Sequence, residues 1–355
     1  MSYKSARIQE TASGNMTRLS ILQIGFGNMG RKWTEYLLKS QFIELKGVVE
    51  TSPAACDLVK SEFGIGAYAS FEEALRKAEF DAVLIVTPPK SHAVIAEAAL
   101  TSGKHVLIEK PLANDLEEAL WLVKQAASCQ RVLMVNQQYR FHPAIRKLAA
   151  MIRGGEIGQL LNIRCRFDRD VQNWLPATDF RITMEHGFLV DMGVHHIDLL
   201  RAITGQEIVR VYAEGWHMPN SVFTHHAATT ALLTLESGAV ALYQGNWASN
   251  DTPTSWHGRW DIEGKEGHLA WYPPEDPLGS SEIVLRRLNG DTVSIKAEKD
   301  ESADGLVGVL EAFARAISSG EEPETNGCDN LKTLGTIFAC TKAIEEHRVV
   351  MPRFA

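Results

Sequence analysis

The sequence predicts two domains: an α/β domain built on a doubly wound parallel sheet, and an α+β domain with a large, mostly antiparallel open sheet. Three observations carry this expectation. Short apolar runs alternate with helical patterns up to about residue 140, and longer runs rich in β-branched and aromatic residues follow. The length of 355 residues also suits two hydrophobic cores better than one.

The apolar runs of the first domain are hydrophobic on both faces, as parallel strands buried between helices are. They read LSILQIG, FIELKGVVE, DAVLIVTP, HVLIEK and RVLMVNQ, and helical patterns lie between them at 29–39, 91–101 and 116–127. Strands that alternate with helices in this way predict right-handed crossovers and helices on both faces of the sheet.

The pattern changes after Pro143. One helix is expected at 144–153, and the strand-like runs LLNIRCRFD, IVRVYAEGW, AATTALLTL, AVALYQGNW, GRWDIEG and IVLRRL follow, with a helix at 195–203 among them. Two helical patterns close the chain at 306–317 and 330–346. The chain is therefore divided into a disordered extension (1–18), a first domain (19–140) and a second domain (141–355).

The composition argues against several classes of protein. A net charge of −8 disfavours nucleic acid or an anionic membrane as the main partner. No segment approaches the ~18 consecutive apolar residues that span a membrane, and the polar first eighteen residues do not resemble a signal peptide. Five scattered cysteines, an odd number, fit a reducing compartment with unpaired thiols. We therefore expect a cytoplasmic protein.

A glycine-rich turn, Gly25-Phe26-Gly27-Asn28-Met29-Gly30, follows the first strand and opens the first helix. In such a turn the first glycine permits the tight bend, the second lets the backbone approach a pyrophosphate, and the third lets helix and strand pack closely. Glu50 ends the second strand, where a carboxylate can bind both ribose hydroxyls but repels a 2′-phosphate. The first domain is thus expected to be a Rossmann domain that contacts NAD, rather than NADP, through these seven residues.

Two further strand ends are expected at the edge of the sheet that faces the ligand crevice. Thr87 and Pro88 end the third apolar run, and Glu109 and Lys110 end the fourth. All four are candidate cofactor contacts, and Lys110 can also reach a reacting hydroxyl. Taken alone, Lys110 is more typical of a surface lysine, so this motif carries weight only in combination.

A third motif reads Asp191-Met192-Gly193-Val194-His195-His196-Ile197-Asp198. Residues three or four apart share a face of a helix, so Asp191, His195 and Asp198 are expected together. A carboxylate beside an imidazole orients the ring and suits it to act as a general base. The alternative is a capped helix start with a hydrogen-bonded histidine, and this interpretation is kept for His196.

Three histidines, His217, His225 and His226, raise the question of a metal site. Neighbouring histidines on a strand face opposite sides, and no cysteine or acid nearby completes a tetrahedron. We therefore expect no bound metal.

The order of the motifs resembles the Gfo/Idh/MocA oxidoreductases, the group that includes glucose–fructose oxidoreductase and inositol dehydrogenase. The resemblance extends from Leu19 to about Pro352 and includes the stretch Gln138-Tyr139-Arg140-Phe141-His142-Pro143 and the closing pattern at 327–350. One departure is Gln138, which stands where asparagine is expected.

The resemblance implies roles by position. Lys110 matches the lysine that contacts the reacting hydroxyl, and Asp191 and His195 match the acid and the histidine that complete the catalytic set. Asp198 matches the last acid of the motif, which binds a substrate hydroxyl or supports the loop. The remaining candidate substrate contacts are Gln138, Arg140, Trp174 and Arg181.

Three functions are compatible with these residues. The first is an NAD-dependent dehydrogenase that interconverts a secondary hydroxyl and a ketone on a sugar, inositol or related polyol. The second is a glycoside hydrolase of the same family that uses tightly held NAD in a transient oxidation. The third is a non-catalytic NAD-binding sensor, a class that should lose the lysine or the histidine, whereas both are present here. We expect a homodimer or homotetramer assembled through the C-terminal sheet.

Overall fold

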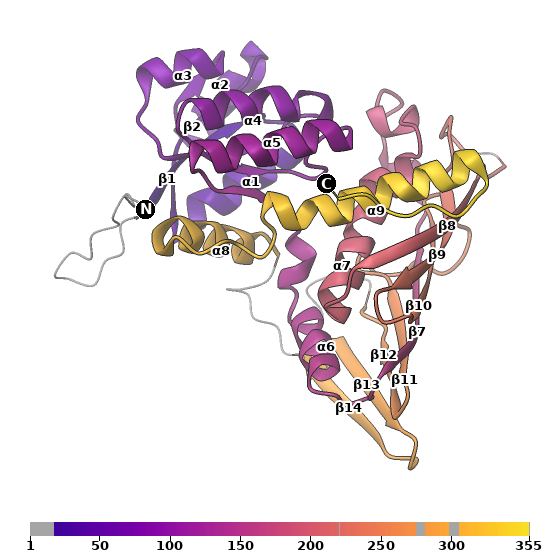
Figure 1. Ribbon diagram of the computed structural model, residues 1–355. Coiled ribbons are helices and arrows are strands. Elements are labelled where there is room, and N and C mark those ends of the chain that lie inside the picture. The colour runs from indigo at the N-terminus through magenta and orange to yellow at the C-terminus, as the bar shows by residue number, and fades with distance from the viewer. Residues whose placement is uncertain (1–17, 220, 275–280, 298–304, 355) are drawn as a thin grey trace. The chain divides into compact units, whose positions relative to one another are not determined.

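The structure is a computed structural model that describes residues 18–219, 221–274, 281–297 and 305–354 (Figure 1). The chain forms two compact units, residues 1–138 with 305–331 and residues 139–304 with 332–355. Of the extension expected at 1–18, residues 1–17 lie outside the described residues. Each unit is described by itself below.

A six-stranded parallel sheet forms the first unit, in the order β3-β2-β1-β4-β5-β6. The strand order reverses between β1 and β4, which is where an open α/β sheet binds its ligand. The expected doubly wound fold is confirmed. The strands are β1 (Leu19–Ile24), β2 (Ile43–Val49), β3 (Ala67–Tyr68), β4 (Ala82–Ile85), β5 (His105–Ile108) and β6 (Leu133–Val135).

Helices connect these strands. Side chains of Ser52, Ser70 and Asp115 cap the N-termini of the second, third and fifth of them. Sequence analysis misses the region from 53 to 77, because its strand has two residues and shows no periodic pattern. The helices are α1 (Asn28–Lys39), α2 (Pro53–Phe63), α3 (Phe71–Lys77), α4 (His92–Thr101), α5 (Leu116–Cys129) and α8 (Gly305–Ser319).

The sequence suggests a single domain boundary near residue 140. In the structure the chain returns to the first unit at residues 305–331. Helix α8 contacts α1, and the backbone N–H of Val135 donates to the carbonyl of Thr325 at 2.9 Å. The segment 305–331 therefore completes the parallel-sheet unit, beside the edge strand β6. Such a long-range contact leaves no local pattern in the sequence.

The second unit is built on an eight-stranded sheet in the order β14-β13-β12-β11-β7-β10-β9-β8. Among the described strands of this sheet, only the pair β7 and β10 is parallel, so the expected mostly antiparallel sheet is confirmed. The strands are β7 (Leu160–Asp168), β8 (Ile208–Trp216), β9 (Ala228–Leu235), β10 (Val240–Asn246), β11 (Arg259–Gly264), β12 (Gly267–Trp271), β13 (Ser281–Arg287) and β14 (Thr292–Ala297). Sequence analysis misses β12 and β14; the latter is a largely exposed edge strand.

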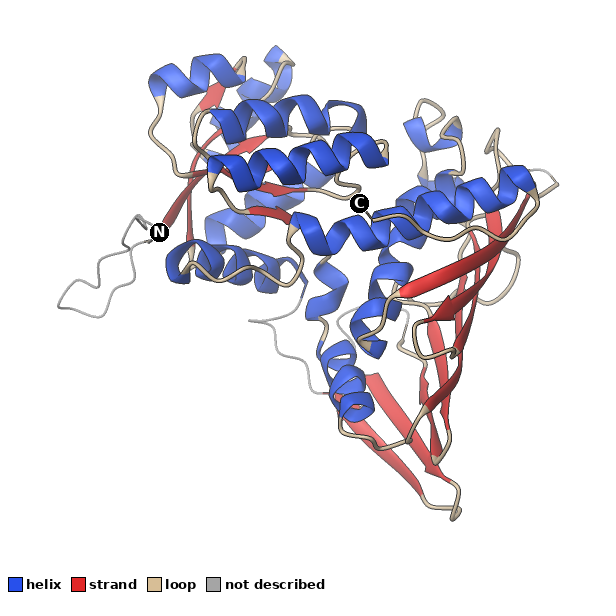
Figure 2. Ribbon diagram, viewed as in Figure 1, coloured by secondary structure: helices blue, strands red, loops and turns tan. Residues whose placement is uncertain are grey.

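Helices α6 (Pro143–Arg153) and α7 (Val194–Thr204) lie on one face of this sheet (Figure 2). The side chains of Trp260, Trp271 and Tyr243 are buried in the core of this unit. Helix α9 (Gly327–Glu346) carries the chain from the first unit into the second. None of the helices in the described part of the chain has the length and apolar character needed to cross a membrane.

Short helical segments connect the larger elements. One of them is π-helical and continues directly into α7, so the Asp191–Asp198 motif is split between two helical geometries. The segments are η1 (Pro89–Ser91), η2 (Gln138–Phe141), η3 (Gln172–Trp174), η4 (Phe180–Ile182) and the π-helical η5 (Phe188–Gly193).

Candidate active site

The three glycines of the turn between β1 and α1 have three different environments. Gly25 has a φ of +101°, and a Cβ there would lie 2.5 Å from the Val86 carbonyl oxygen. A Cβ on Gly30 would lie 2.5 Å from the carbonyl oxygen of Gly25. A Cβ on Gly27 would meet nothing within 4 Å. The first and third glycines are therefore required by the fold, whereas the second borders open space that a phosphate can approach.

Gln23 holds this turn from inside and was not singled out in the sequence. Its side chain is fully buried, and its Nε2 donates to the carbonyl oxygens of Gly25 (2.8 Å) and Gly30 (2.9 Å). The Thr34 hydroxyl donates to the Oε1 of Gln23 at 3.1 Å. A polar residue inside an apolar strand is the signal that could have identified it, because a buried amide needs hydrogen-bond partners.

Glu50 follows β2 and reaches the glycine turn. Its Oε2 accepts a hydrogen bond from the backbone N–H of Phe26 at 2.9 Å, and its Oε1 accepts one from Ser52 N–H at 2.9 Å. These two bonds fix the carboxylate beside the turn, and a carboxylate with about four lone-pair positions can accept further bonds. The position suits the ribose contact expected for Glu50.

Lys110 lies in a turn held by buried groups of the first unit. Glu109, only 8% exposed, accepts hydrogen bonds at Oε1 from Trp33 Nε1 (2.7 Å) and Asn136 Nδ2 (2.8 Å). The Glu109 side chain therefore positions the residue after it, and its predicted contact with the cofactor stays a prediction. Lys110 itself is partly exposed, and the peptide bond between Lys110 and Pro111 is cis.

His92 joins the two strand ends. Its Nδ1 lies 2.8 Å from the Pro111 carbonyl oxygen and its Nε2 lies 2.9 Å from that of Thr87. Burial lowers the pKa of His92, although both carbonyl groups oppose that shift. Thr87 is partly exposed and accepts a hydrogen bond from the Ser91 hydroxyl at 2.8 Å, while Pro88 is exposed. Both remain available as cofactor contacts.

Two buried acceptors follow β6 at the carboxyl edge of the parallel sheet. Among the described residues, Asn136 Oδ1 and Gln138 Oε1 have no hydrogen-bond partner. A buried acceptor without a partner costs about 1–3 kcal/mol, so such atoms are typically satisfied by a ligand or water. Together with the open side of Gly27, they indicate that the first unit fits a dinucleotide.

In the second unit, Asp191 lies in the π-helical turn η5. Arg181 Nε donates to Asp191 Oδ2 at 2.9 Å, and Arg181 Nη1 contacts both carboxylate oxygens of Asp179 at 3.2 Å. All three side chains are partly buried, and the two carboxylates raise the pKa of Arg181 against the effect of burial. Arg181, a candidate substrate contact from the sequence, thus bridges Asp179 and Asp191 and holds Asp191 in a fixed orientation. π-Turns of this kind often occur at functional sites.

His195, 4% exposed, stacks against Tyr139, with ring centroids 4.6 Å apart. Burial raises the pKa of Tyr139; the negative charge of Asp191 raises it further, and the positive charge of Arg169 lowers it. Asp191 and Arg169 therefore lie within electrostatic range of Tyr139, and Tyr139 contacts His195. Sequence analysis misses Tyr139 and Arg169, because neither belongs to the Asp191–Asp198 motif.

The other imidazoles near this cluster are structural. His196 lies 2.9 Å from the Tyr243 hydroxyl and 3.0 Å from the Trp256 carbonyl, and burial lowers its pKa to about 4. Burial also lowers the pKa of His142 to about 4 and that of His257 well below its usual range. These rings are neutral at physiological pH.

Asp198 and Arg140, both expected to contact substrate, bind each other. Arg140 Nε and Nη2 donate to the two carboxylate oxygens of Asp198, each at 2.6 Å, and the side chains are 8% and 1% exposed. The Thr333 hydroxyl donates to Asp198 Oδ1 at 3.0 Å. Of the two roles open for Asp198, this geometry favours support of the fold over contact with a substrate.

Trp174 is 57% exposed at η3, as a side chain that meets a ligand can be. The guanidinium of Arg169 lies 5.3 Å from the Trp174 ring centroid and 4.7 Å from that of Trp256. The buried Arg169 guanidinium thus joins the two indole rings in one cluster of the second unit.

Comparison with known proteins gives the family. The family described as "Oxidoreductase family, NAD-binding Rossmann fold" matches residues 19–137, and the "GFO/IDH/MocA C-terminal domain" matches residues 145–270. The chain belongs to the Gfo/Idh/MocA family. It is therefore an NAD(P)-dependent oxidoreductase acting on CH–OH groups, as the resemblance of its motifs implies.

Named relatives of this Gfo/Idh/MocA protein are similar over nearly their whole length. A myo-inositol 2-dehydrogenase of Thermotoga maritima is 25% identical over 333 residues, which cover 92% of this chain and 96% of the relative. A D-xylose 1-dehydrogenase (NADP(+)) of Haloferax volcanii is 27% identical over 328 residues, 91% and 96% of the two chains. An oxidoreductase of Agrobacterium radiobacter, solved with NAD+, L-tartaric acid and magnesium, has the same fold, with a TM-score of 0.84, 23% identity and coverage of 94% and 98%.

The glycine turn of this Gfo/Idh/MocA protein gives a first test. Gly30→Ala should destabilise the fold by about 1–3 kcal/mol, because the new methyl group meets backbone rather than a movable side chain. Gly27→Ala should leave stability unchanged and weaken NAD binding, because its methyl group enters the open space. Thermal melts without cofactor and NAD titrations of both variants provide the measurement. Normal NAD affinity in Gly27→Ala would contradict the assignment of this space to the pyrophosphate.

Proposed function

We propose that the protein is an NAD-dependent dehydrogenase that interconverts a secondary hydroxyl and a ketone on a sugar, inositol or related polyol. The observation that carries the proposal is the set of polar groups around η5 and the start of α7. There Asp191 is oriented by Arg181, and His195 stacks on Tyr139. Relatives named for inositol, xylose and UDP-N-acetylglucosamine support a substrate rich in hydroxyl groups.

The protein's own residues handle binding and one proton. A nicotinamide dinucleotide, when bound, accepts the hydride. His195 accepts the proton of the reacting hydroxyl, and Lys110 donates a hydrogen bond to the same oxygen, which are the roles that the family implies for these positions. Asp191, held by Arg181, accepts hydrogen bonds from hydroxyls beside the reacting carbon. Asp198 acts as a positioning residue through Arg140.

The substrate prediction can be tested with two alcohols. A ring polyol such as an inositol should be oxidised with a much higher kcat/KM than isopropanol, because a site built for several hydroxyls leaves donors and acceptors unsatisfied when they are missing. The measurement is NADH formation together with product analysis. Comparable kcat/KM for isopropanol, or acceptance of anionic hydroxy acids alone, would contradict the proposal. Release of a free sugar without net NADH would instead identify a glycoside hydrolase.

Cofactor preference should depend on Glu50. We expect NAD to be used at least about tenfold better than NADP, because the carboxylate meets the 2′-phosphate as a like charge. Glu50→Gln keeps an acceptor for the Phe26 N–H but removes the charge, so the preference should fall. Glu44→Gln, an exposed acid near the start of the same strand, is the matched control. If the unmodified enzyme has equal kcat/KM with NAD and NADP, the role assigned to Glu50 in cofactor preference is wrong.

We also propose that two copies associate through the outer face of the eight-stranded sheet. Tyr212, Leu232 and Leu242 are aligned across three neighbouring strands and are 37%, 47% and 41% exposed. Aligned apolar side chains on an open sheet face favour burial against another surface. The sedimentation of a Leu232→Glu variant, compared with that of the unmodified chain, tests the proposal; unchanged assembly would contradict it.

A further inference from the structure

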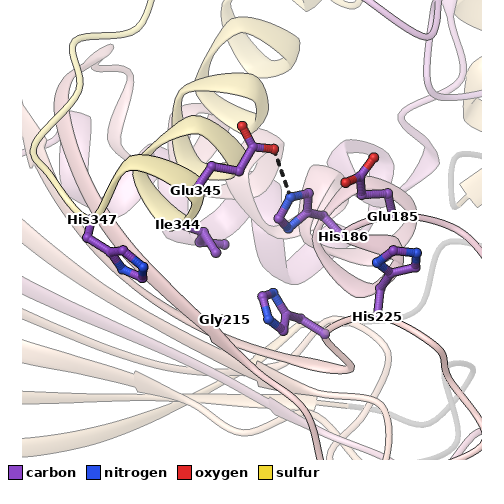
Figure 3. A pocket seen from close by; sticks show the side chains of 8 residues that line it. Glu185, His186, Gly215, His225, Ile344, Glu345 and His347 are labelled. Atoms are coloured by element: carbon purple, nitrogen blue, oxygen red, sulfur yellow. Dashed lines mark hydrogen bonds and ion pairs between the residues drawn. The ribbon is translucent and has the colours of Figure 1, made fainter.

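A polar pocket of about 330 Å³ lies in the second unit, between the C-terminal part of α9, strand β8 and the loops at 185–186 and 225–226 (Figure 3). None of its acidic or imidazole side chains has a role in the proposed function. They are Glu185, His186, His225, His226, Glu345 and His347.

Three of these side chains converge. Glu185, His186 and Glu345 each offer one nitrogen or oxygen atom, and these atoms lie within 4.8 Å of one another. His186 Nε2 is 3.1 Å from Glu345 Oε1, and Figure 3 shows both side chains directed toward each other. Ligand atoms around a tetrahedral zinc ion are roughly 3.4 Å apart, given bonds of about 2.0–2.1 Å. Both glutamates are exposed, so a change of rotamer can close the remaining gap.

His186 itself is only 9% exposed, and its Nδ1 has no hydrogen-bond partner among the described residues. Its φ of +47° is in the left-handed region, which is unfavourable for a residue with a Cβ. Such conformations persist where the surroundings require them and are frequent at ligand sites. The other ring nitrogen, Nε2, faces Glu345, and an imidazole nitrogen beside two carboxylates is an arrangement that a metal ion can bind.

A second imidazole, that of His226, lies beside these groups. The ring centroids of His186 and His226 are 5.7 Å apart. A Cβ on Gly215 would lie 2.6 Å from Nδ1 of His226, so the glycine in β8 leaves room for this ring.

We propose that Glu185, His186 and Glu345 bind a divalent transition-metal ion of the zinc type, at a position that His226 borders. Imidazole and carboxylate ligands together favour Zn²⁺ over Mg²⁺ or Ca²⁺, which prefer oxygen ligands. The expectation of no metal from the sequence rested on His225 and His226 facing opposite sides of a strand. The structure places them in a loop before β9, and the acids come from distant positions.

The site would join α9 to the segment that carries Asp191. The backbone N–H of Val190 donates to the carbonyl of His186 at 3.0 Å, so His186 precedes η5 directly. Glu345 lies in the last turn of α9. Because the ion binds the folded state only, it stabilises the second unit and restrains the start of the π-helical turn.

The proposal can be tested on tag-free, metal-stripped protein of full length. Titration with Zn²⁺ in a calorimeter should show one saturable site per chain, and Zn²⁺ at about a hundredfold excess over Kd should raise the Tm by roughly 5–10 °C. Glu345→Gln should weaken Zn²⁺ binding at least about tenfold and remove most of the Tm increase. Because Glu345 is exposed, the Glu345→Gln variant should fold normally. His186→Ala should likewise weaken Zn²⁺ binding.

Two controls isolate the site. Glu346→Gln changes the next residue of α9, whose carboxylate pairs with Arg348 and Lys342, and His268→Ala removes an imidazole paired with Asp261 elsewhere in the unit. Both should bind Zn²⁺ like the unmodified protein. The proposal is overturned if Zn²⁺ binding is not saturable, or if Glu345→Gln and the controls bind equally well.

Discussion

Lys110→Ala and His195→Ala should each reduce kcat by about 10²–10⁴-fold, the usual range for a positioned acid–base group. In the proposed chemistry both side chains act on the oxygen of the reacting hydroxyl: Lys110 donates a hydrogen bond to it, and His195 accepts its proton. Their losses should therefore be less than additive in the double variant. NAD affinity should change little, because neither residue belongs to the glycine turn. Steady-state kinetics with a polyol substrate and NAD titrations provide the measurement.

Matched controls distinguish chemistry from loss of structure. Lys77→Ala removes an exposed lysine that pairs with Glu73, and His268→Ala removes a partly exposed histidine of the second unit. Both controls should retain normal kcat. Near-normal turnover of Lys110→Ala with a good substrate, or strictly additive losses, would show that the two residues do not act on one proton transfer.

Asp198→Asn should destabilise the protein by about 3–5 kcal/mol, because it leaves the buried guanidinium of Arg140 without its counter-charge. The nearby Arg201, whose Nη1 lies 3.9 Å from Asp198 Oδ1, loses the same negative charge, whereas the Thr333 hydroxyl can still donate to the amide oxygen. Urea unfolding followed by tryptophan fluorescence measures the loss. Because the chain has two units, the two transitions should be fitted separately.

An exposed ion pair provides the comparison. Asp251→Asn removes one of the two carboxylate partners of Arg166, which keeps Asp168; the Asp251 and Arg166 side chains are 53% and 46% exposed, so no measurable destabilisation is expected. The same pair of variants tests the role of Asp198. If Asp198→Asn remains stable and raises KM instead, Asp198 is a substrate ligand and not a positioning residue.

The fold class and the glycine turn could be predicted from the sequence, because their signals are local. Gly25, Gly27 and Gly30 are spaced as a strand–turn–helix requires, and the structure gives the three positions the separate environments expected of them. The parallel strands of the first unit were identified because burial on both faces makes them continuously apolar. The two-residue strand β3 and the largely exposed edge strand β14 have no continuous apolar run of this kind and were missed.

Tertiary structure alone decided which polar groups meet. Arg140 and Asp198 are 58 positions apart in the chain, and only the folded structure shows that they form a buried ion pair with each other. His186 and Glu345 are 159 positions apart, so no motif spacing could bring them together. Local sequence determines turns, caps and faces, because those depend on neighbours along the chain. The partners of buried charges and imidazoles depend on how distant elements pack, and packing is a property of the folded chain.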